Sequence, residues 1–144
     1  MSTFTPCNVL VTGGAEFIGS HFVRYLLSQD RQIQIVTLDA LTYAGSLDNL
    51  VSLSDSKRHH FIQGDICDRS LIRSILRDYS IETVVHFAAE SHVDRSITGP
   101  AVFIQTNIVG TYSLLEESRI FWLDEKSWDN RSCRFHHIST DEVY

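Results

Sequence analysis

The chain has 144 residues, 43% of them apolar, and it carries a formal net charge of −6. This length fits one domain with its own apolar core, which excludes a disordered tail, a collagen-like repeat and a disulfide-stabilised mini-domain. The acidic balance argues against nucleic-acid binding and against docking on acidic membranes, and no apolar run approaches the roughly 20 residues of a membrane span.

Short apolar runs alternate with amphipathic stretches along the chain. A strand at 8–11 precedes a helix at 17–28, and strands at 33–38 and 60–63 come next. A helix capped by Asp68, a strand at 83–88, a long helix from Pro100 to Arg119, a polar loop at 124–132 and a strand at 135–139 follow. This order predicts an α/β fold with a doubly wound parallel sheet, truncated after its fifth strand.

The spacing of the cysteines and histidines predicts neither a disulfide nor a metal site. Cys7, Cys67 and Cys133 are odd in number and show no C-x-x-C spacing, so we expect free thiols in a reducing compartment. Residues 1–8 show neither region of a secretory signal, which indicates a cytoplasmic protein. The seven histidines have no metal-ligand spacing, so no metal site is expected.

A glycine-rich loop follows the first expected strand and opens the first helix. It contains Gly13, Gly14 and Gly19, and Asp39 lies twenty residues beyond Gly19 at the end of the second strand. This arrangement is typical of Rossmann-like dinucleotide-binding domains, in which N–H groups at the helix start hold the pyrophosphate. Asp39 would accept hydrogen bonds from the adenosine ribose and repel a 2′-phosphate. The pattern therefore predicts an NAD-binding Rossmann domain over residues 1–144.

Glu16 interrupts the loop at the place where glycine normally lets the backbone approach the pyrophosphate. Two unit charges about 4 Å apart interact by about 4 kcal/mol at an effective dielectric near 20, which would weaken binding by up to roughly a thousandfold. Our hypothesis is that Glu16 weakens NAD binding. In the alternative, the side chain turns out to solvent and costs little.

Several segments resemble the extended short-chain dehydrogenase/reductase family, and within it the 4,6-dehydratases of nucleotide sugars. They are 11–20, 41–45, 64–68, 86–100, 106–111 and 135–144, and the most specific are AAESHVDRSI at 88–97 and STDEVY at 139–144. The resemblance implies an NAD-dependent lyase whose substrate is the nucleotide sugar dTDP-glucose. The product would be its 4-keto-6-deoxy derivative.

The resemblance also implies a set of cofactor contacts. Beside Gly13 and Gly19, it places Phe17 and Ile18 at the pyrophosphate, Asp39, Leu41 and Thr42 at the adenosine ribose, Asp65 and Ile66 at the adenine, Phe87, Ala88, Ala89, Glu90 and Ser91 along the cofactor, and Thr106 at its nicotinamide half. Ser91 would also reach the sugar. Ala40 stands where the family usually has a lysine, so one positive contact to the cofactor is missing.

The resemblance assigns catalytic roles to three residues after the last expected strand. Glu142 would take the C5 proton as general base, and Asp141 would protonate the departing C6 hydroxyl as general acid. Thr140 would bind the C4 oxygen. From the residues alone, an Asp-Glu pair is more often a solvated loop.

Three interpretations stay open. The family's Tyr-x-x-x-Lys motif is absent from these residues, so we expect the isolated chain to be inactive, either as the NAD-binding part of a dehydratase or as a non-enzymatic remnant. Another nucleotide-sugar epimerase or decarboxylase is the third, but these usually lack the sequence at 140–142.

The resemblance further implies a possible homodimer through the helix from Pro100 to Arg119. The expected apolar stripe of this helix consists of Phe103, Ile104, Ile108, Thr111, Leu114 and Leu115. A plain core helix is the alternative.

Overall fold

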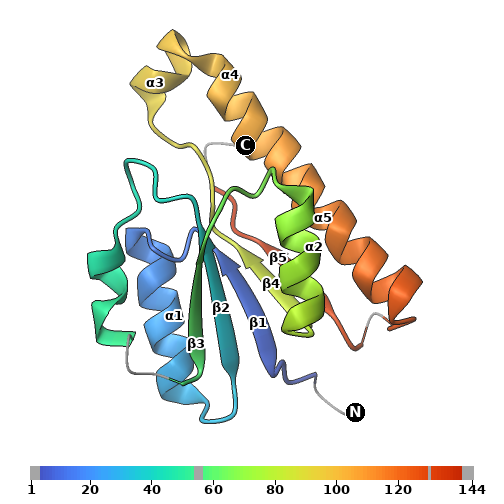
Figure 1. Ribbon diagram of the computed structural model, residues 1–144. Coiled ribbons are helices and arrows are strands. Elements are labelled where there is room, and N and C mark those ends of the chain that lie inside the picture. The colour runs from blue at the N-terminus through green and yellow to red at the C-terminus, as the bar shows by residue number, and fades with distance from the viewer. Residues whose placement is uncertain (1–3, 54–56, 130, 141–144) are drawn as a thin grey trace.

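The computed structural model describes residues 4–53, 57–129 and 131–140. They contain five parallel strands in the order β3-β2-β1-β4-β5, which confirms the expected parallel α/β sheet (Figure 1). The strands are β1 (Asn8–Thr12), β2 (Gln34–Asp39), β3 (His59–Gln63), β4 (Thr83–His86) and β5 (Arg134–His137). Strands β2 and β3 are added on one side of β1, and β4 and β5 on the other. A crevice is therefore expected at the carboxyl ends of β1 and β4, where the strand order switches sides.

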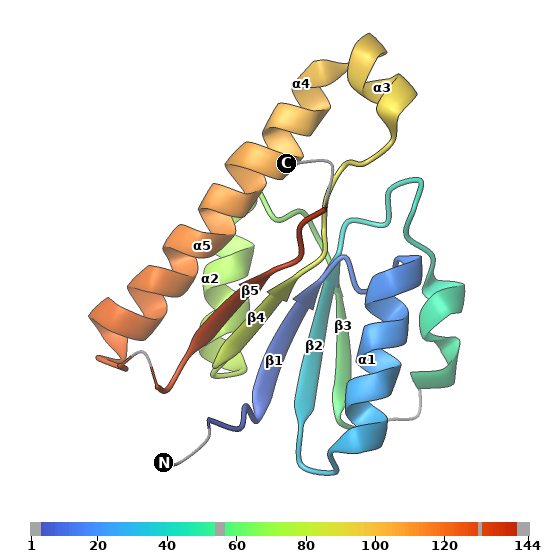
Figure 2. The ribbon, with the colours of Figure 1, turned by 180° about the vertical axis from the view of Figure 1, so that it is seen from behind.

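Helices cover both faces of the sheet (Figures 1 and 2). Helix α1 (Phe17–Gln29) lies on one face together with the short 3₁₀ helix η1 (Leu47–Leu53). Helix α2 (Arg69–Asp78) and a long helical run lie on the other face. That run consists of α4 (Pro100–Phe103), the π-helical segment η2 (Ile104–Gly110), α5 (Thr111–Arg119) and the π-helical segment η3 (Ile120–Glu125).

Two apolar clusters stabilise these layers, one on each face of the sheet. Alternation along β1 sends Val9 and Val11 to the cluster under α1 and Leu10 to the cluster under α2 and α5. Phe121 and Trp122 close the second cluster, and the Trp122 indole N–H donates to the carbonyl of Ile81 at 2.7 Å. Both aromatic side chains therefore pack in the core.

The local signals at the start of α2 are confirmed, whereas several boundaries differ. The Asp68 carboxylate accepts a hydrogen bond from the N–H of Leu71 at 3.0 Å and caps α2 as expected. The long helical run continues to Glu125, into the expected loop, and β4 ends at His86 instead of residue 88. The last strand is Arg134–His137 instead of 135–139. A further helix, α3 (Val93–Thr98), was not expected.

The apolar stripe expected on the long helix is wrong in part. Ile104, Ile108 and Leu115 are about half exposed or more, whereas Leu114 is buried. Glu117 occupies the core-facing side, where its carboxylate accepts hydrogen bonds from Arg69 and Arg73 of α2 at 2.7 and 2.9 Å. The helix therefore meets α2 along a line that includes a buried carboxylate, and part of its apolar surface faces away from the sheet. Among the described helices, none has the length and apolarity needed to cross a membrane.

Candidate functional site

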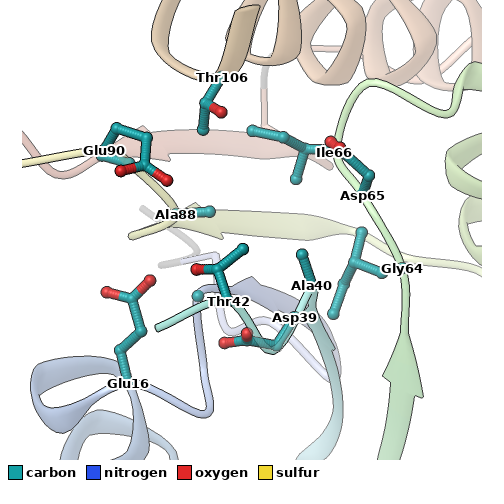
Figure 3. A pocket seen from close by; sticks show the side chains of 13 residues that line it. Glu16, Asp39, Ala40, Thr42, Gly64, Asp65, Ile66, Ala88, Glu90 and Thr106 are labelled. Carbon is teal, nitrogen blue, oxygen red and sulfur yellow. The ribbon is translucent and has the colours of Figure 1, made fainter. Parts of the chain in front are cut away.

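A pocket opens at the carboxyl edge of the sheet, where the loops after β1, β2, β3 and β4 come together (Figure 3). Ten of the residues expected to hold a cofactor line it: Gly13, Asp39, Ala40, Thr42, Asp65, Ile66, Ala88, Ala89, Glu90 and Thr106. Leu38, Gly64 and Glu16 complete the lining. The structure thus brings together segments that lie up to 93 residues apart in the chain, from Gly13 to Thr106.

The glycine loop has the geometry that a close backbone approach requires. Gly13 has a φ of 68°, in the left-handed region, and its N–H donates to the carbonyl of Leu38 at 3.0 Å. A Cβ at Gly13 would lie 2.7 Å from the backbone nitrogen of Ala88. A Cβ at Gly19 would overlap the carbonyl oxygen of Gly13. Helix α1 therefore starts directly against the loop, and Glu16, the residue before its first turn, lines the pocket.

Asp39 lies at the end of β2 as expected, but the structure shows backbone partners for its carboxylate. One oxygen accepts from the N–H of Ala15 at 2.9 Å and the other from the N–H of Leu41 at 2.8 Å. Only 5% of the residue is exposed. Each carboxylate oxygen can accept a second hydrogen bond, so Asp39 can hold the glycine loop and still receive a ribose hydroxyl.

Glu16 lines the pocket, so the structure does not show the alternative in which it turns out to solvent. Its side chain is half-buried and points toward Glu90 across the pocket (Figure 3). Burial, followed by the negative charges of Asp39 and Glu90, raises the pKa of Glu16 to about 7. Ala40 contributes no charge, and among the described residues that line the pocket none is basic.

The remaining expected cofactor residues surround the pocket without lining it. The side chains of Phe17 and Ile18, in the first turn of α1, are 74% and 65% exposed. Leu41 is half-buried, and Phe87 packs its ring 5.2 Å from that of Phe22. Ser91 is exposed in the segment before α3. A contact of Phe17 or Ile18 with a phosphate would therefore use the backbone.

Two polar networks support the pocket, and residue patterns did not reveal them. The Asn107 side chain accepts from the N–H of Glu90 at 2.8 Å and donates to its carbonyl at 2.9 Å, which fixes the loop after β4. The His86 imidazole lies 2.6 Å from the Thr12 hydroxyl and 2.9 Å from the Thr111 hydroxyl. Burial, with a smaller effect of His137, lowers the pKa of His86 to about 4, so this imidazole is neutral at neutral pH.

A further contact spans the loops after β2 and β4. The Arg95 guanidinium lies 4.1 Å from the centroid of the Tyr43 ring, and His92 approaches the same ring edge-on at 6.3 Å. Both segments belong to stretches that carry the family resemblance, but their pairing depends on the fold. Cation–π contacts of this kind hold two loops together without a hydrogen bond.

The expected catalytic segment is only partly described. Thr140 is exposed and lies three residues beyond the end of β5, at the carboxyl edge of the sheet. Asp141 and Glu142 lie outside the described residues. Within the described ranges, no group of three His, Cys, Asp or Glu side chains could hold a metal ion.

A parallel sheet with a glycine loop at the start of its first helix and an acidic residue at the end of β2 defines a Rossmann-type dinucleotide-binding domain. Comparison with known proteins agrees with this class. The chain belongs to the family described as GDP-mannose 4,6 dehydratase, which matches residues 10–144.

The similar proteins within and near this family are nucleotide-sugar enzymes. The chain is 54% identical over 136 residues to the dTDP-glucose 4,6-dehydratase of Salmonella typhimurium, covering 94% of this chain and 37% of the relative. The crystal structure of the Bacillus anthracis dTDP-glucose 4,6-dehydratase in complex with NAD is similar at 36% identity and a TM-score of 0.78, over 96% of this chain and 39% of that one. A Thermus thermophilus UDP-glucose 4-epimerase with NAD shows 34% identity and a TM-score of 0.69, over 79% of this chain and 34% of that one. The chain thus spans about two fifths or less of their lengths.

Proposed function

We propose that residues 1–144 form the NAD-binding domain of a dTDP-glucose 4,6-dehydratase, a lyase of deoxysugar biosynthesis that forms the 4-keto-6-deoxy product. The observation that carries the proposal is the pocket itself. The glycine loop, Asp39 and the stretch that begins at Ala88 converge on one cavity at the switch point of the sheet.

The residues present fit a dinucleotide in all but two positions, Glu16 and Ala40. The N-terminus of α1 would receive the pyrophosphate, and Asp39 with Leu41 and Thr42 would hold the adenosine ribose. Asp65 and Ile66 would flank the adenine, Ala88, Ala89 and Glu90 would lie along the cofactor, and Thr106 would contact its nicotinamide half. The chemistry that NAD would supply in this pocket is reversible hydride transfer. Ala40 supplies no positive charge to the cofactor, and the ionised carboxylate of Glu16 opposes the pyrophosphate.

The acid–base part of the proposal concerns the segment after β5. Glu142 would take the C5 proton of the sugar, Asp141 would protonate the departing C6 hydroxyl, and Thr140 would bind the C4 oxygen. Ser91 would contact the sugar from the loop before α3. The support is positional, since Thr140 follows β5 at the edge where ligands bind in open α/β sheets. A 4-epimerase is the weaker alternative because Thr140-Asp141-Glu142 matches the dehydratase pattern.

Binding of NAD is the direct test. We expect isothermal titration at pH 6 to detect NAD binding to the chain and tighter or equal binding to the Glu16→Gly variant. No binding to either would refute the NAD site. The lyase activity is tested with dTDP-glucose and NAD on the native protein from the cells that make it. Formation of the C4 epimer of dTDP-glucose in place of a 4-keto-6-deoxy sugar would refute the dehydratase assignment.

We also propose a cytoplasmic homodimer that uses the long helix. Ile104 and Ile108 are 54% and 62% exposed, and together with Leu115 they leave an apolar surface on the helix uncovered. The free thiols of all three cysteines are consistent with a reducing compartment. Sedimentation equilibrium of the chain and of an Ile108→Lys variant tests the dimer, because the lysine would place a charge in the interface. A monomeric unmodified chain would refute it.

A further inference from the structure

Glu16 occupies the residue before α1 but does not behave as a helix cap. Its side chain makes no capping hydrogen bond with the N–H groups of the first turn. An acidic residue at this position usually lies over those groups, where the helix dipole stabilises its charge. Here the carboxyl group extends into the pocket toward Glu90 (Figure 3). The N-terminus of α1 is therefore left open to a ligand, and the carboxyl group lies beside it.

The charges around Glu16 are negative on every side that faces the pocket. Asp39 approaches from β2, Glu90 from the loop after β4, and Asp65 lines the pocket from the loop after β3. Ionised Glu16 therefore has no cation among the described lining residues to offset it.

Basic side chains on the neighbouring elements have other partners. On α1, the His21 ring lies 2.7 Å from the carbonyl of Phe17, and Arg24 donates to the carbonyl of Asn49 at 2.6 Å. Arg95, from α3, stacks on the Tyr43 ring. Among the described residues, none of these three side chains forms a hydrogen bond or ion pair with Glu16, so the burial of its carboxyl group and its acidic neighbours set its titration.

The two protonation states of Glu16 have opposite effects on an anionic ligand. Ionised, the carboxylate repels a pyrophosphate that approaches the start of α1. Protonated, the carboxyl group is neutral and gains an O–H that can donate to a phosphate oxygen. We propose that this site binds the dinucleotide together with one proton, which is held on Glu16, so that cofactor occupancy depends on pH. The inference rests on the proposed NAD site.

The coupling has a defined pH window. Because the pKa of Glu16 in the free site is about 7, the group is mostly protonated at pH 6 and mostly ionised at pH 9. Linkage then predicts a dissociation constant for NAD that is nearly constant below pH 6 and rises about tenfold per pH unit above pH 7. Between pH 6 and pH 9 the expected loss of affinity is about a hundredfold.

Calorimetry of NAD binding tests the proposal. Titrations of the chain at pH 6, 7, 8 and 9 give the affinity profile, and titrations at pH 8 in two buffers of different ionisation enthalpy give the number of protons taken up. Glu16→Gln keeps the size of the side chain and removes its charge, so its profile should be flat. Glu16→Gly removes both the side chain and its charge, so its profile should also be flat. Asp78→Asn is the matched control, because Asp78 lies at the last turn of α2, at the opposite end of the sheet, and the profile should stay steep.

A second readout needs no ligand. The ¹³C resonance of the Glu16 carboxyl group, assigned by its loss in Glu16→Gln, should titrate near pH 7 in the free chain. A titration below pH 5, or a steep affinity profile that persists in Glu16→Gln, would overturn the coupling. NAD binding with a flat profile and no proton uptake would overturn the coupling alone. Absence of binding by both the chain and Glu16→Gly at pH 6 would overturn the NAD site and the coupling with it.

Discussion

Replacement of Gly13 by alanine should damage both the loop and the pocket. Gly13 has a φ of 68°, and an added Cβ would lie 2.7 and 2.9 Å from the nitrogen and Cα of Ala88 and 3.0 Å from the carbonyl carbon of Phe87. All three are backbone atoms, so no side-chain rotation relieves the overlap. The left-handed conformation costs alanine about 1–2 kcal/mol. Overlap with fixed atoms costs about 1–3 kcal/mol more.

The free energy of unfolding should therefore fall by about 2–5 kcal/mol, a large part of the 5–15 kcal/mol that is typical of a domain. Urea denaturation followed by circular dichroism measures it. Gly99→Ala is the control, because its Cβ would meet only the carbonyl oxygen of Arg95 at 3.7 Å, an ordinary contact. A Gly13→Ala chain as stable as Gly99→Ala would show that the loop adjusts freely and that its close approach to Ala88 is not needed.

Two predictions concern buried titratable groups on the α2 side of the sheet. Burial raises the pKa of Glu117, but hydrogen bonds from Arg73 and Arg69 lower it by more than burial raises it. The pKa of Glu117 therefore lies below its ordinary value of 4.5. Its stabilising effect is present above pH 4.5 and is lost as the pH falls through the folded pKa. Glu117→Gln should lower the free energy of unfolding, measured by urea denaturation, by about 2 kcal/mol at pH 7 and by less at pH 3.5. Glu116→Gln is the control and should cost clearly less, because it breaks an exposed pair with Arg119. Burial lowers the pKa of His86 from 6.5 to about 4, so roughly 3 kcal/mol of stability should be lost as the pH falls from 6.5 to 4. Titration of the His86 ring protons by NMR near pH 6.5 would contradict this.

Local patterns in the chain predicted the order of strands and helices because each signal lies within a few residues. The glycine loop, the Asp68 cap and the apolar runs of β1, β2 and β4 depend on backbone propensity and on side-chain alternation, which neighbouring residues decide. The identity of most pocket residues followed from family resemblance. Without that resemblance, the order of the elements, the glycine loop and Asp39 predicted a parallel sheet with a dinucleotide site at its carboxyl edge.

Long-range contacts decided the rest. Asp39 binds the N–H of Ala15, 24 residues away, and Glu90 is held by Asn107. Glu117 faces the core only because α2 places two arginines opposite it. Helical periodicity shows that α5 has an apolar side, but the angle at which the helix docks selects which residues are buried, so Ile108 is exposed and Leu114 is not. The position of Glu16 beside the α1 N-terminus was evident from the residues. Its raised pKa depends first on burial and then on the charges of Asp39 and Glu90, and only the folded chain provides both.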